Sequence, residues 1–243
     1  MQLIPGCSKR SRCGVHKTVI RVRGSCSENE HEHVSRARSL RWAFFNSLLA
    51  ILFFLGTSSF AASNPFDDAS AAYERGDYVQ AMKLFRQLAE QGHQWAQRRV
   101  GSMYAEGKGA PQDYQEAVKW YRLAAAQKNT PAQYSLGLAY EKGQGVPQDF
   151  QEAVNLYRLA AAQGNQFAQI NLGVVYAHGR GVRQDFVRAH MWFNLAAAAL
   201  SGDSGDTAIK KRDRIASKMT AEQLATAQEM ERRCQESKLK NCD

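Results

Sequence analysis

Apolar and small residues recur along the chain at helical spacing and predict a series of amphipathic helices. After Asp113, a stripe of apolar residues falls at positions i, i+3, i+4, i+7 and i+8 of one segment, namely Ala117, Trp120, Tyr121, Ala124 and Ala125. This spacing places all five side chains on one face of a helix. Because an apolar face must be covered in a soluble protein, we expect this helix to pack against neighbouring helices.

The pattern repeats with a period of 36 residues, and three segments align without a gap at 94–129, 130–165 and 166–200. A fixed period of this length is typical of proteins built from stacked helical hairpins. Each unit has a glycine and a tyrosine in its first helix, two glycines in a loop and an aspartate before its second helix. The matched glycines, tyrosines and aspartates are Gly101, Gly137, Gly173, Tyr104, Tyr140, Tyr176, Asp113, Asp149 and Asp185.

Each unit is predicted to form a helix, a tight turn and a second helix. Asp113 and Asp149 are expected to cap the second helices, with Glu116 and Glu152 completing a capping box three residues later. In the third unit Arg188 replaces the glutamate, so only the cap remains. The loop glycines permit positive φ angles in the turn. Since a glycine inside a helix costs about 1 kcal/mol relative to alanine, the first-helix glycines predict a close approach between helices.

Shorter elements flank the three units. Residues 62–93 repeat the second-helix pattern after Asp77 and resemble a plain tetratricopeptide hairpin with a short turn. After the third unit, residues 200–206 read as a linker, followed by expected helices at 208–219 and 221–236. Thr220 and Gln223 form a capping-box pattern for the second of these. The last hairpin of a stacked array exposes an apolar face, which must be covered by an element with a polar outer side. Residues 201–243 are therefore predicted to cap the array.

The motif from Ala132 to Ala161 resembles the Sel-one-like repeat family, a longer-looped relative of tetratricopeptide repeats. Its pattern is Ala-x-x-x-Leu-Gly-x-x-Tyr-x-x-Gly-x-Gly-Val-x-x-Asp-x-x-x-Ala-x-x-x-Tyr-x-x-Ala-Ala. The first unit departs from it at Val100, Ala110 and Lys128. The resemblance implies an all-α protein, a right-handed α/α superhelical solenoid that acts as an adaptor or scaffold in protein–protein interaction. It does not identify the partner.

Recognition should depend on first-helix positions that vary between units while the packing frame stays constant. In such solenoids the first helices usually line a concave groove. We therefore expect an extended peptide or a helix of a partner protein to contact Arg98, Arg99, Met103, Tyr134, Ile170 and Asn171. Solvated side chains with no partner would vary in the same way. By contrast, Gln97, Gln133 and Gln169 occupy one position and do not vary.

The N-terminal residues 1–61 have the features of a secretory signal preceded by an extension. A basic stretch at 36–41 is followed by an apolar run at 42–56 and by small residues that predict cleavage between Ala61 and Ala62. An uncleaved anchor is the alternative, but the run is shorter than the roughly 20 residues that span a bilayer. Residues 1–33 are expected to be discarded, or never made if translation starts at Val34. We predict a periplasmic or secreted protein without membrane attachment after cleavage.

Charge and cysteine content change once this segment is set aside. The whole chain carries a net charge of +9, but residues 1–61 hold nine basic and three acidic residues, which leaves 23 against 20 in the remainder. An excess of three is too small to predict a nucleic-acid partner. Only Cys234 and Cys242 remain, and their short separation predicts one disulfide in an oxidising compartment, with two free thiols as the alternative.

Few residues suggest catalysis, and we expect no enzyme activity, cofactor or metal. The Gly-x-Gly pairs lack the rest of a nucleotide-binding motif. His93, His178 and His190 share no register within the repeat. Ser237 and Lys240 match the Ser-x-x-Lys pattern of penicillin-recognising enzymes, so a β-lactamase-like hydrolase is one alternative, although the companion motifs are missing. A component of envelope polysaccharide assembly or a regulator is another.

Overall fold

The computed structural model describes residues 64–240 and 242. The predicted leader at 1–61, its cleavage site and the cysteines and histidines within it lie outside the described residues. The chain divides into a unit of residues 1–61 and a unit of residues 62–243, and only the second is described below. None of the helices in the described part is long and apolar enough to cross a membrane.

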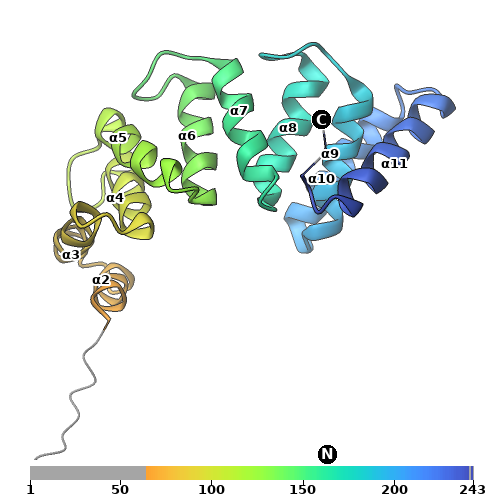
Figure 1. The fold of residues 1–243 in the computed structure, drawn as a ribbon. Coiled ribbons are helices and arrows are strands. Elements are labelled where there is room, and N and C mark those ends of the chain that lie inside the picture. The colour runs from red at the N-terminus through yellow and green to blue at the C-terminus, as the bar shows by residue number, and fades with distance from the viewer. Residues whose placement is uncertain (1–63, 241, 243) are drawn as a thin grey trace, which may run out of the picture. The chain divides into compact units, whose positions relative to one another are not determined.

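The described residues form ten helices and no strand, as the all-α expectation requires (Figure 1). The helices are α2 (Pro65–Glu74), α3 (Tyr78–Glu90), α4 (Gln94–Glu106), α5 (Tyr114–Ala126), α6 (Thr130–Lys142), α7 (Phe150–Ala161), α8 (Gln166–His178), α9 (Phe186–Ala199), α10 (Gly202–Ala216) and α11 (Ala221–Glu236). Helices α2 to α9 each pack against the next in chain order, and α11 returns to pack on α9, so successive hairpins stack into an α/α solenoid. Below, α4, α6 and α8 are called the first helices and α5, α7 and α9 the second helices.

Glycines of the first helices lie where two helices meet most closely. A Cβ atom on Gly137 would lie 2.7 Å from the ring of Tyr157, and one on Gly173 would lie 2.6 Å from the ring of Phe193. Gly101 has the same relationship to the ring of Tyr121, at 2.7 Å. The close approach predicted from the sequence is therefore the contact of a first-helix backbone with an aromatic ring of the second helix.

Aspartates at the start of the second helices cap them, but the predicted capping boxes at Glu116 and Glu152 do not form. Asp113 Oδ1 accepts hydrogen bonds from the first backbone N–H groups of α5. The N–H of Asp113 itself donates to the carbonyl oxygen of Tyr104 at 3.0 Å. Because this donor is already satisfied within the unit, Glu116 is free to pair with Lys119. The same bond joins Asp149 to Tyr140 at 3.0 Å.

The C-terminal helices differ from the expected pattern in one respect. Residues 202–207, expected to belong largely to a linker, form the first turns of α10, which begins at Gly202 and ends at Ala216. Glycine, serine and aspartate favour turns in isolation, but packing against α9 overrides this preference. Gly205 is buried there, and a Cβ on it would lie 2.8 Å from the carbonyl oxygen of Leu200. Helix α11 has the predicted capping box of Thr220 and Gln223.

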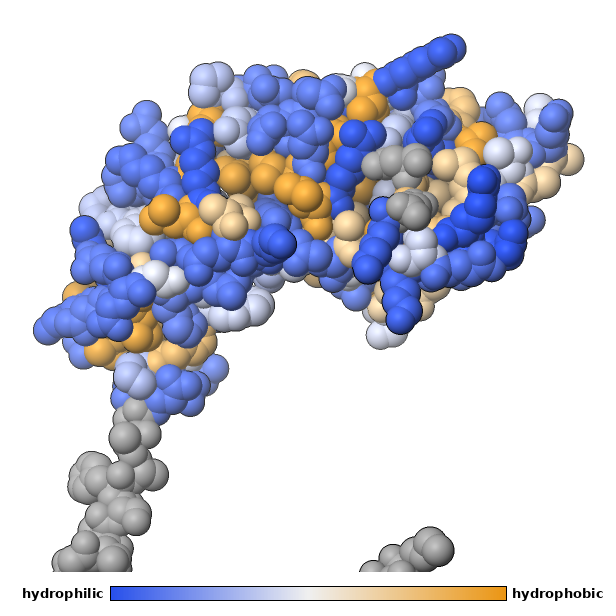
Figure 2. All heavy atoms as spheres, in the orientation of Figure 1, coloured by the Kyte–Doolittle hydropathy of each residue, from blue (hydrophilic) through white to orange (hydrophobic). Residues whose placement is uncertain are grey.

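Helix α11 covers one side of α9, whereas the corresponding side of α5 and α7 is exposed to solvent. Helix α11 packs on α9, where Met191 and Leu195 belong to a buried cluster that also contains Cys234. The residues of α5 and α7 aligned with Leu195 are Leu123 and Leu159, which are 50% and 53% exposed. Figure 2 shows apolar surface among polar side chains over the middle helices. A disulfide between Cys234 and Cys242 ties the last residues to the end of α11.

Candidate functional site

The first helices present one row of partly exposed side chains, which we call the first-helix face. It consists of three aligned positions in α4, α6 and α8, each separated from the next by three or four residues, so they share one side of each helix. Phe167 and Trp95 are the most exposed, at 48% and 47%, and the others are partly buried. The face is formed by Trp95, Arg98, Ser102, Pro131, Tyr134, Leu138, Phe167, Ile170 and Val174.

Two residues predicted to contact a partner also fill the seams between successive hairpins. The Tyr134 ring lies 6.2 Å from the Phe167 ring of the next first helix and 6.0 Å from the Tyr157 ring. The Arg99 guanidinium stacks 5.0 Å above the Tyr73 ring in α2. Both residues are half-buried, so they have a packing role whether or not a partner is bound.

The neighbouring predicted residues Arg98, Ile170 and Asn171 are also half-buried. Burial lowers the pKa of Arg98, and the nearby charge of Arg99 lowers it further. A partly desolvated guanidinium gains more from a hydrogen-bonding partner than a fully hydrated one does. These three residues remain candidates for contact with a partner.

Met103 is placed differently, and its prediction as a contact residue is wrong. Its side chain is fully buried in the cluster that contains Phe85 and Val100. The aligned Ala139 and Val175 are buried too, so this position belongs to the core in every unit. The variation among Met, Ala and Val therefore changes the volume of the core and does not reflect recognition.

Two of the three glutamines that do not vary link helices inside the solenoid. Gln97 and Gln133 are almost fully buried. Gln127 Nε2 donates to Gln97 Oε1 at 2.8 Å, and Gln163 Nε2 donates to Gln133 Oε1 at 2.7 Å. Each pair joins the end of a second helix to the first helix of the same unit, which explains Gln97 and Gln133. The position that would pair with Gln169 is Ala199, and Gln169 Oε1 has no hydrogen-bond partner among the described residues.

The first-helix face continues into a pocket of about 440 Å³ between α8 and α10, which sequence reasoning missed. Val174, Phe193 and Ile215 provide apolar lining, whereas three cations provide charge, namely Lys211, Arg214 and Lys218. Neither Lys211 nor Arg214 forms an ion pair with any residue that the structure describes, and no carboxylate lines the pocket. Such a pocket can hold an apolar side chain next to a negative charge. We refer to it as the α10 pocket.

A signal for this pocket was present in the sequence. Lys211, Arg214 and Lys218 follow each other at spacings of three and four residues, which places them on one side of a helix. Lys218 Nζ lies 5.6 Å from the ring centre of Phe186. The expected helix at 208–219 already contained all three residues, but it was interpreted only as a cover for the array.

Other residues with suspected chemistry have structural contacts. Ser237 ends α11, and its Oγ donates to the carbonyl oxygen of Cys234 at 2.9 Å. His93 caps α4 by accepting from the N–H of Ala96 at 3.3 Å. No group of three or more His, Cys, Asp or Glu side chains among the described residues could hold a metal ion.

Comparison with known proteins yields one family and a set of similar solved structures that includes the two described below. The Sel1 repeat family matches at residues 70–93, 96–129, 130–165 and 166–199, so the leading hairpin counts as a fourth match. A Sel1 repeat protein from Oxalobacter formigenes is 30% identical, with a TM-score of 0.57 over 62% of this chain and 58% of that one.

The second structure is a protective antigen present in uropathogenic Escherichia coli strains, which displays an SLR fold. It is 29% identical, with a TM-score of 0.49 over 65% of this chain and 41% of that one. The present chain thus spans well under two thirds of both proteins. No curated protein matches it.

Proposed function

Because this chain belongs to the Sel1 repeat family, we propose that it is a non-enzymatic adaptor that binds an extended segment of a partner protein along its first helices. Sel1 repeat proteins generally mediate protein–protein interactions, and their scaffolds are typically non-enzymatic. The observation that carries the proposal is the continuity of the partly exposed first-helix face with the α10 pocket.

Side-chain chemistry along this surface defines the kind of segment that would fit. On α4 the row combines an exposed Trp95 with the polar Arg98 and Ser102. On α8 it is apolar throughout, with Phe167, Ile170 and Val174. Apolar anchors in partly desolvated positions contribute most of the binding energy in protein interfaces. The cations of the α10 pocket add a site for negative charge. The proposed partner segment therefore has apolar residues followed or preceded by an acidic group.

We place this interaction outside the cytoplasm, in the periplasm or the secreted fraction of a bacterial cell. The apolar run and small residues before Ala62 support export. The disulfide of Cys234 and Cys242 is compatible with an oxidising compartment. Fractionation of cells, combined with N-terminal sequencing of the mature protein, tests this step. We expect a mature chain beginning at Ala62 in the periplasmic or secreted fraction, and a full-length cytoplasmic chain would contradict export.

Site-directed photocrosslinking tests the binding face. A photoreactive amino acid replaces Phe167 on the first-helix face or, as a matched control, Val79 on α3, which is 72% exposed. Both positions are exposed and apolar, so they differ mainly in location. We expect a defined crosslinked protein from position 167 and none from position 79. Equal crosslinking at both positions, or none at 167, would count against the proposed face.

Charge reversal distinguishes specific binding at the α10 pocket from nonspecific association. Lys211→Glu combined with Arg214→Glu reverses two of the three cations that line the α10 pocket and should reduce crosslinking from position 167 about tenfold or more, since loss of charge pairing weakens association. Lys119→Glu and Lys142→Glu together make the same change in net charge outside that pocket. If this control reduces crosslinking equally, the α10 pocket has no special role.

A further inference from the structure

A stripe of positive charge in the α10 pocket runs past an apolar side chain. Lys211 and Arg214 lie in α10, and Lys218 follows in the turn after it. Ile215 comes one turn after Lys211, so it shares their side of the helix. Ile215 is only 5% exposed, whereas Arg214 and Lys218 are exposed and Lys211 is half-buried. The pocket thus has an apolar inner part and a positively charged rim.

The other polar side chains that line the α10 pocket already form hydrogen bonds. Gln184 Nε2 donates to the carbonyl oxygen of Ala177 at 2.8 Å, and His178 Nδ1 donates to that of Val174 at 2.9 Å. No carboxylate lines the pocket, and none of its three cations forms an ion pair with a residue that the structure describes. The groups left to meet a polar ligand are therefore cations, which donate hydrogen bonds and accept none.

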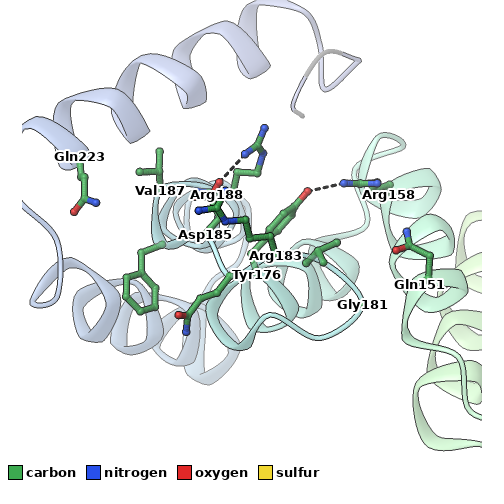
Figure 3. Close-up of a pocket in the computed structure, with 12 residues that line it drawn as sticks. Gln151, Arg158, Tyr176, Gly181, Arg183, Asp185, Val187, Arg188 and Gln223 are labelled. Carbon is green, nitrogen blue, oxygen red and sulfur yellow. Dashed lines mark hydrogen bonds and ion pairs between the residues drawn. The ribbon is translucent and has the colours of Figure 1, made fainter.

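A larger pocket nearby, of about 670 Å³, has its charges arranged differently (Figure 3). It lies beside the loop that joins α8 to α9 and contains Arg183 and Arg188, where the first two units have proline and glutamate. Arg188 Nη1 pairs there with Asp185 Oδ2 at 2.6 Å, and Arg158 Nη2 donates to the Tyr176 hydroxyl at 2.7 Å. Because that lining includes its own carboxylate, the α10 pocket is the stronger candidate for an anionic ligand.

We propose that the α10 pocket binds the free C-terminus of the partner segment, with an apolar last side chain in its inner part and the α-carboxylate at its cationic rim. This inference rests on the proposed function and names the part of the partner that occupies the pocket. A carboxylate has two acceptor oxygens and no donor, which complements a rim that has donors alone. Hydrogen bonds between charged groups are also stronger than neutral ones. The volume of about 440 Å³ is in the range of small-ligand sites and accommodates one terminal residue.

Spacing within the ligand favours a chain end over an internal acidic residue. In an extended chain successive side chains point to opposite sides, and those on one side are two residues, or roughly 7 Å, apart. A C-terminal residue instead has its side chain and its carboxylate on one Cα atom. The apolar and cationic lining residues of α10 are equally close, since Arg214 and Ile215 are consecutive. A ligand with both groups on one atom matches this arrangement.

The place of the pocket in the solenoid also favours a chain end. The first-helix face runs over α4, α6 and α8, and the α10 pocket lies at its α8 end. A segment that lies along this face therefore reaches the pocket with one of its ends. When that end is the C-terminus, the residues before it lie over α8 and then over α6.

Peptides that differ only at the C-terminus test the proposal. The probe is a fluorescein-labelled peptide of sequence Gly-Ser-Phe-Ser-Val-Ser-Leu, in which the apolar side chains share one side of the extended chain. Fluorescence anisotropy measures binding of its free acid, of its C-terminal amide, and of an amide extended by Ser-Asp-Ser. We expect the free acid to bind at least about tenfold more tightly than either amide, because only the acid has a carboxylate on the leucine Cα atom.

A further peptide tests the apolar part of the pocket. A free acid that ends in Gly in place of Leu should bind at least about tenfold more weakly, because it leaves the inner part unfilled. Equal affinity of these two acids, equal affinity of acid and simple amide, or no binding by the Leu acid overturns the proposal. If the extended amide binds as tightly as the Leu acid, the inference is also wrong, but the proposed function stands, since it requires only an acidic group and is tested by crosslinking from position 167.

Variants of the protein test whether the cations of this pocket are responsible. Lys211→Gln and Arg214→Gln are each compared with Lys210→Gln, which removes a charge from the same helix but outside the pocket. We expect the ratio of acid to amide affinity to fall about threefold in the first two variants and to stay at the wild-type value in the third. This ratio does not depend on the fraction of folded protein, which matters because cations near the end of a helix also stabilise it. A ratio unchanged in both pocket variants, or lowered equally in Lys210→Gln, overturns the assignment.

Discussion

The Arg122 guanidinium donates a hydrogen bond to the Tyr140 hydroxyl at 2.9 Å and so joins the second helix of one unit to the first helix of the next. The same pair recurs as Arg86 with Tyr104 at 3.5 Å and as Arg158 with Tyr176 at 2.7 Å. The bonds shorten along the array, and the last tyrosine is also the most buried of the three. These pairs fix the seam between consecutive hairpins.

We predict that removing the tyrosine hydroxyls costs more stability towards the C-terminal end of the array. Tyr104→Phe should change the free energy of unfolding very little, Tyr140→Phe should cost about 0.5 kcal/mol and Tyr176→Phe about 1–1.5 kcal/mol, as expected for hydrogen bonds of increasing quality and burial. Urea denaturation of the three variants measures this order. Equal losses would show that burial and bond length do not determine how much each hydrogen bond contributes to the free energy of unfolding.

A second prediction concerns Lys128, which has a φ angle of +62° in the turn between α5 and α6. The aligned residue of the next unit is Gly164, with φ of +82°. A left-handed backbone costs a residue with a side chain roughly 1–2 kcal/mol, partly offset by the greater entropy of glycine in the unfolded chain. Lys128→Gly should therefore raise the free energy of unfolding by about 0.5–1 kcal/mol in denaturant titrations.

The matched control for this substitution is Lys128→Ala. It removes the same charge and side chain but keeps a Cβ atom in the left-handed conformation. We expect it to leave stability close to that of wild type. If alanine stabilises the protein as much as glycine does, the gain comes from the loss of the lysine side chain and not from the backbone.

Loop glycines with similar φ angles should differ greatly in their tolerance of a side chain. Gly145 and Gly164 have φ of +75° and +82°. A Cβ on Gly145 would lie 2.1 Å from the carbonyl oxygen of Tyr114, whereas nothing lies within 4 Å at Gly164. Gly164→Ala should cost about 1 kcal/mol for the backbone alone. Gly145→Ala should cost about 3 kcal/mol or more, because the loop must also move away from α5. Thermal unfolding of both variants checks the difference.

The stability of the protein should fall below neutral pH because of His190 in α9. Burial lowers the pKa of this imidazole, and the nearby positive charge of Arg212 lowers it further, although Glu231 and Asp213 oppose the shift. The unfolded chain therefore takes up a proton near pH 6.5 while the folded chain does not. As the pH falls from 7 to 5, the free energy of unfolding should decrease by at most about 1.4 kcal/mol per pH unit from this group.

Replacing His190 isolates its contribution from that of the carboxylates. His190→Gln should flatten the dependence of unfolding free energy on pH between 7 and 5. His178→Gln changes an exposed histidine on α8 and serves as control. A pH dependence that is the same in wild type and in His190→Gln would rule out this histidine as the cause.

Sequence reasoning located the repeated helices well because their chemistry is local. The aspartate caps and the glycines facing aromatic rings recur every 36 residues and specify contacts within their own unit. The second loop glycine recurs equally and specifies a close approach to the preceding hairpin. The start of α10 was missed because its first residues are poor helix formers in isolation. Its helical state depends on packing against α9, which lies before it in the chain and has an apolar outer side.

The candidate sites were harder to predict, because they combine residues from several units. Variation between units identified Arg98, Tyr134 and Ile170 but also the buried Met103, since a periodic alignment does not distinguish a core position from an exposed one. The same alignment contained the substitutions at 183 and 188. The fold places these two positions beside Arg158, which lies 25 residues or more away in the sequence.

The cover of α9 by α11 also bears on how such an array can grow during evolution. Met191 and Leu195 are suited to contact with α11, whereas the aligned residues of α5 and α7 face solvent. A duplicated unit inserted before α9 would meet surfaces like those already present on either side. One inserted after it would separate α9 from its cover and leave an apolar side in water. The array can therefore gain units before the last unit but not after it.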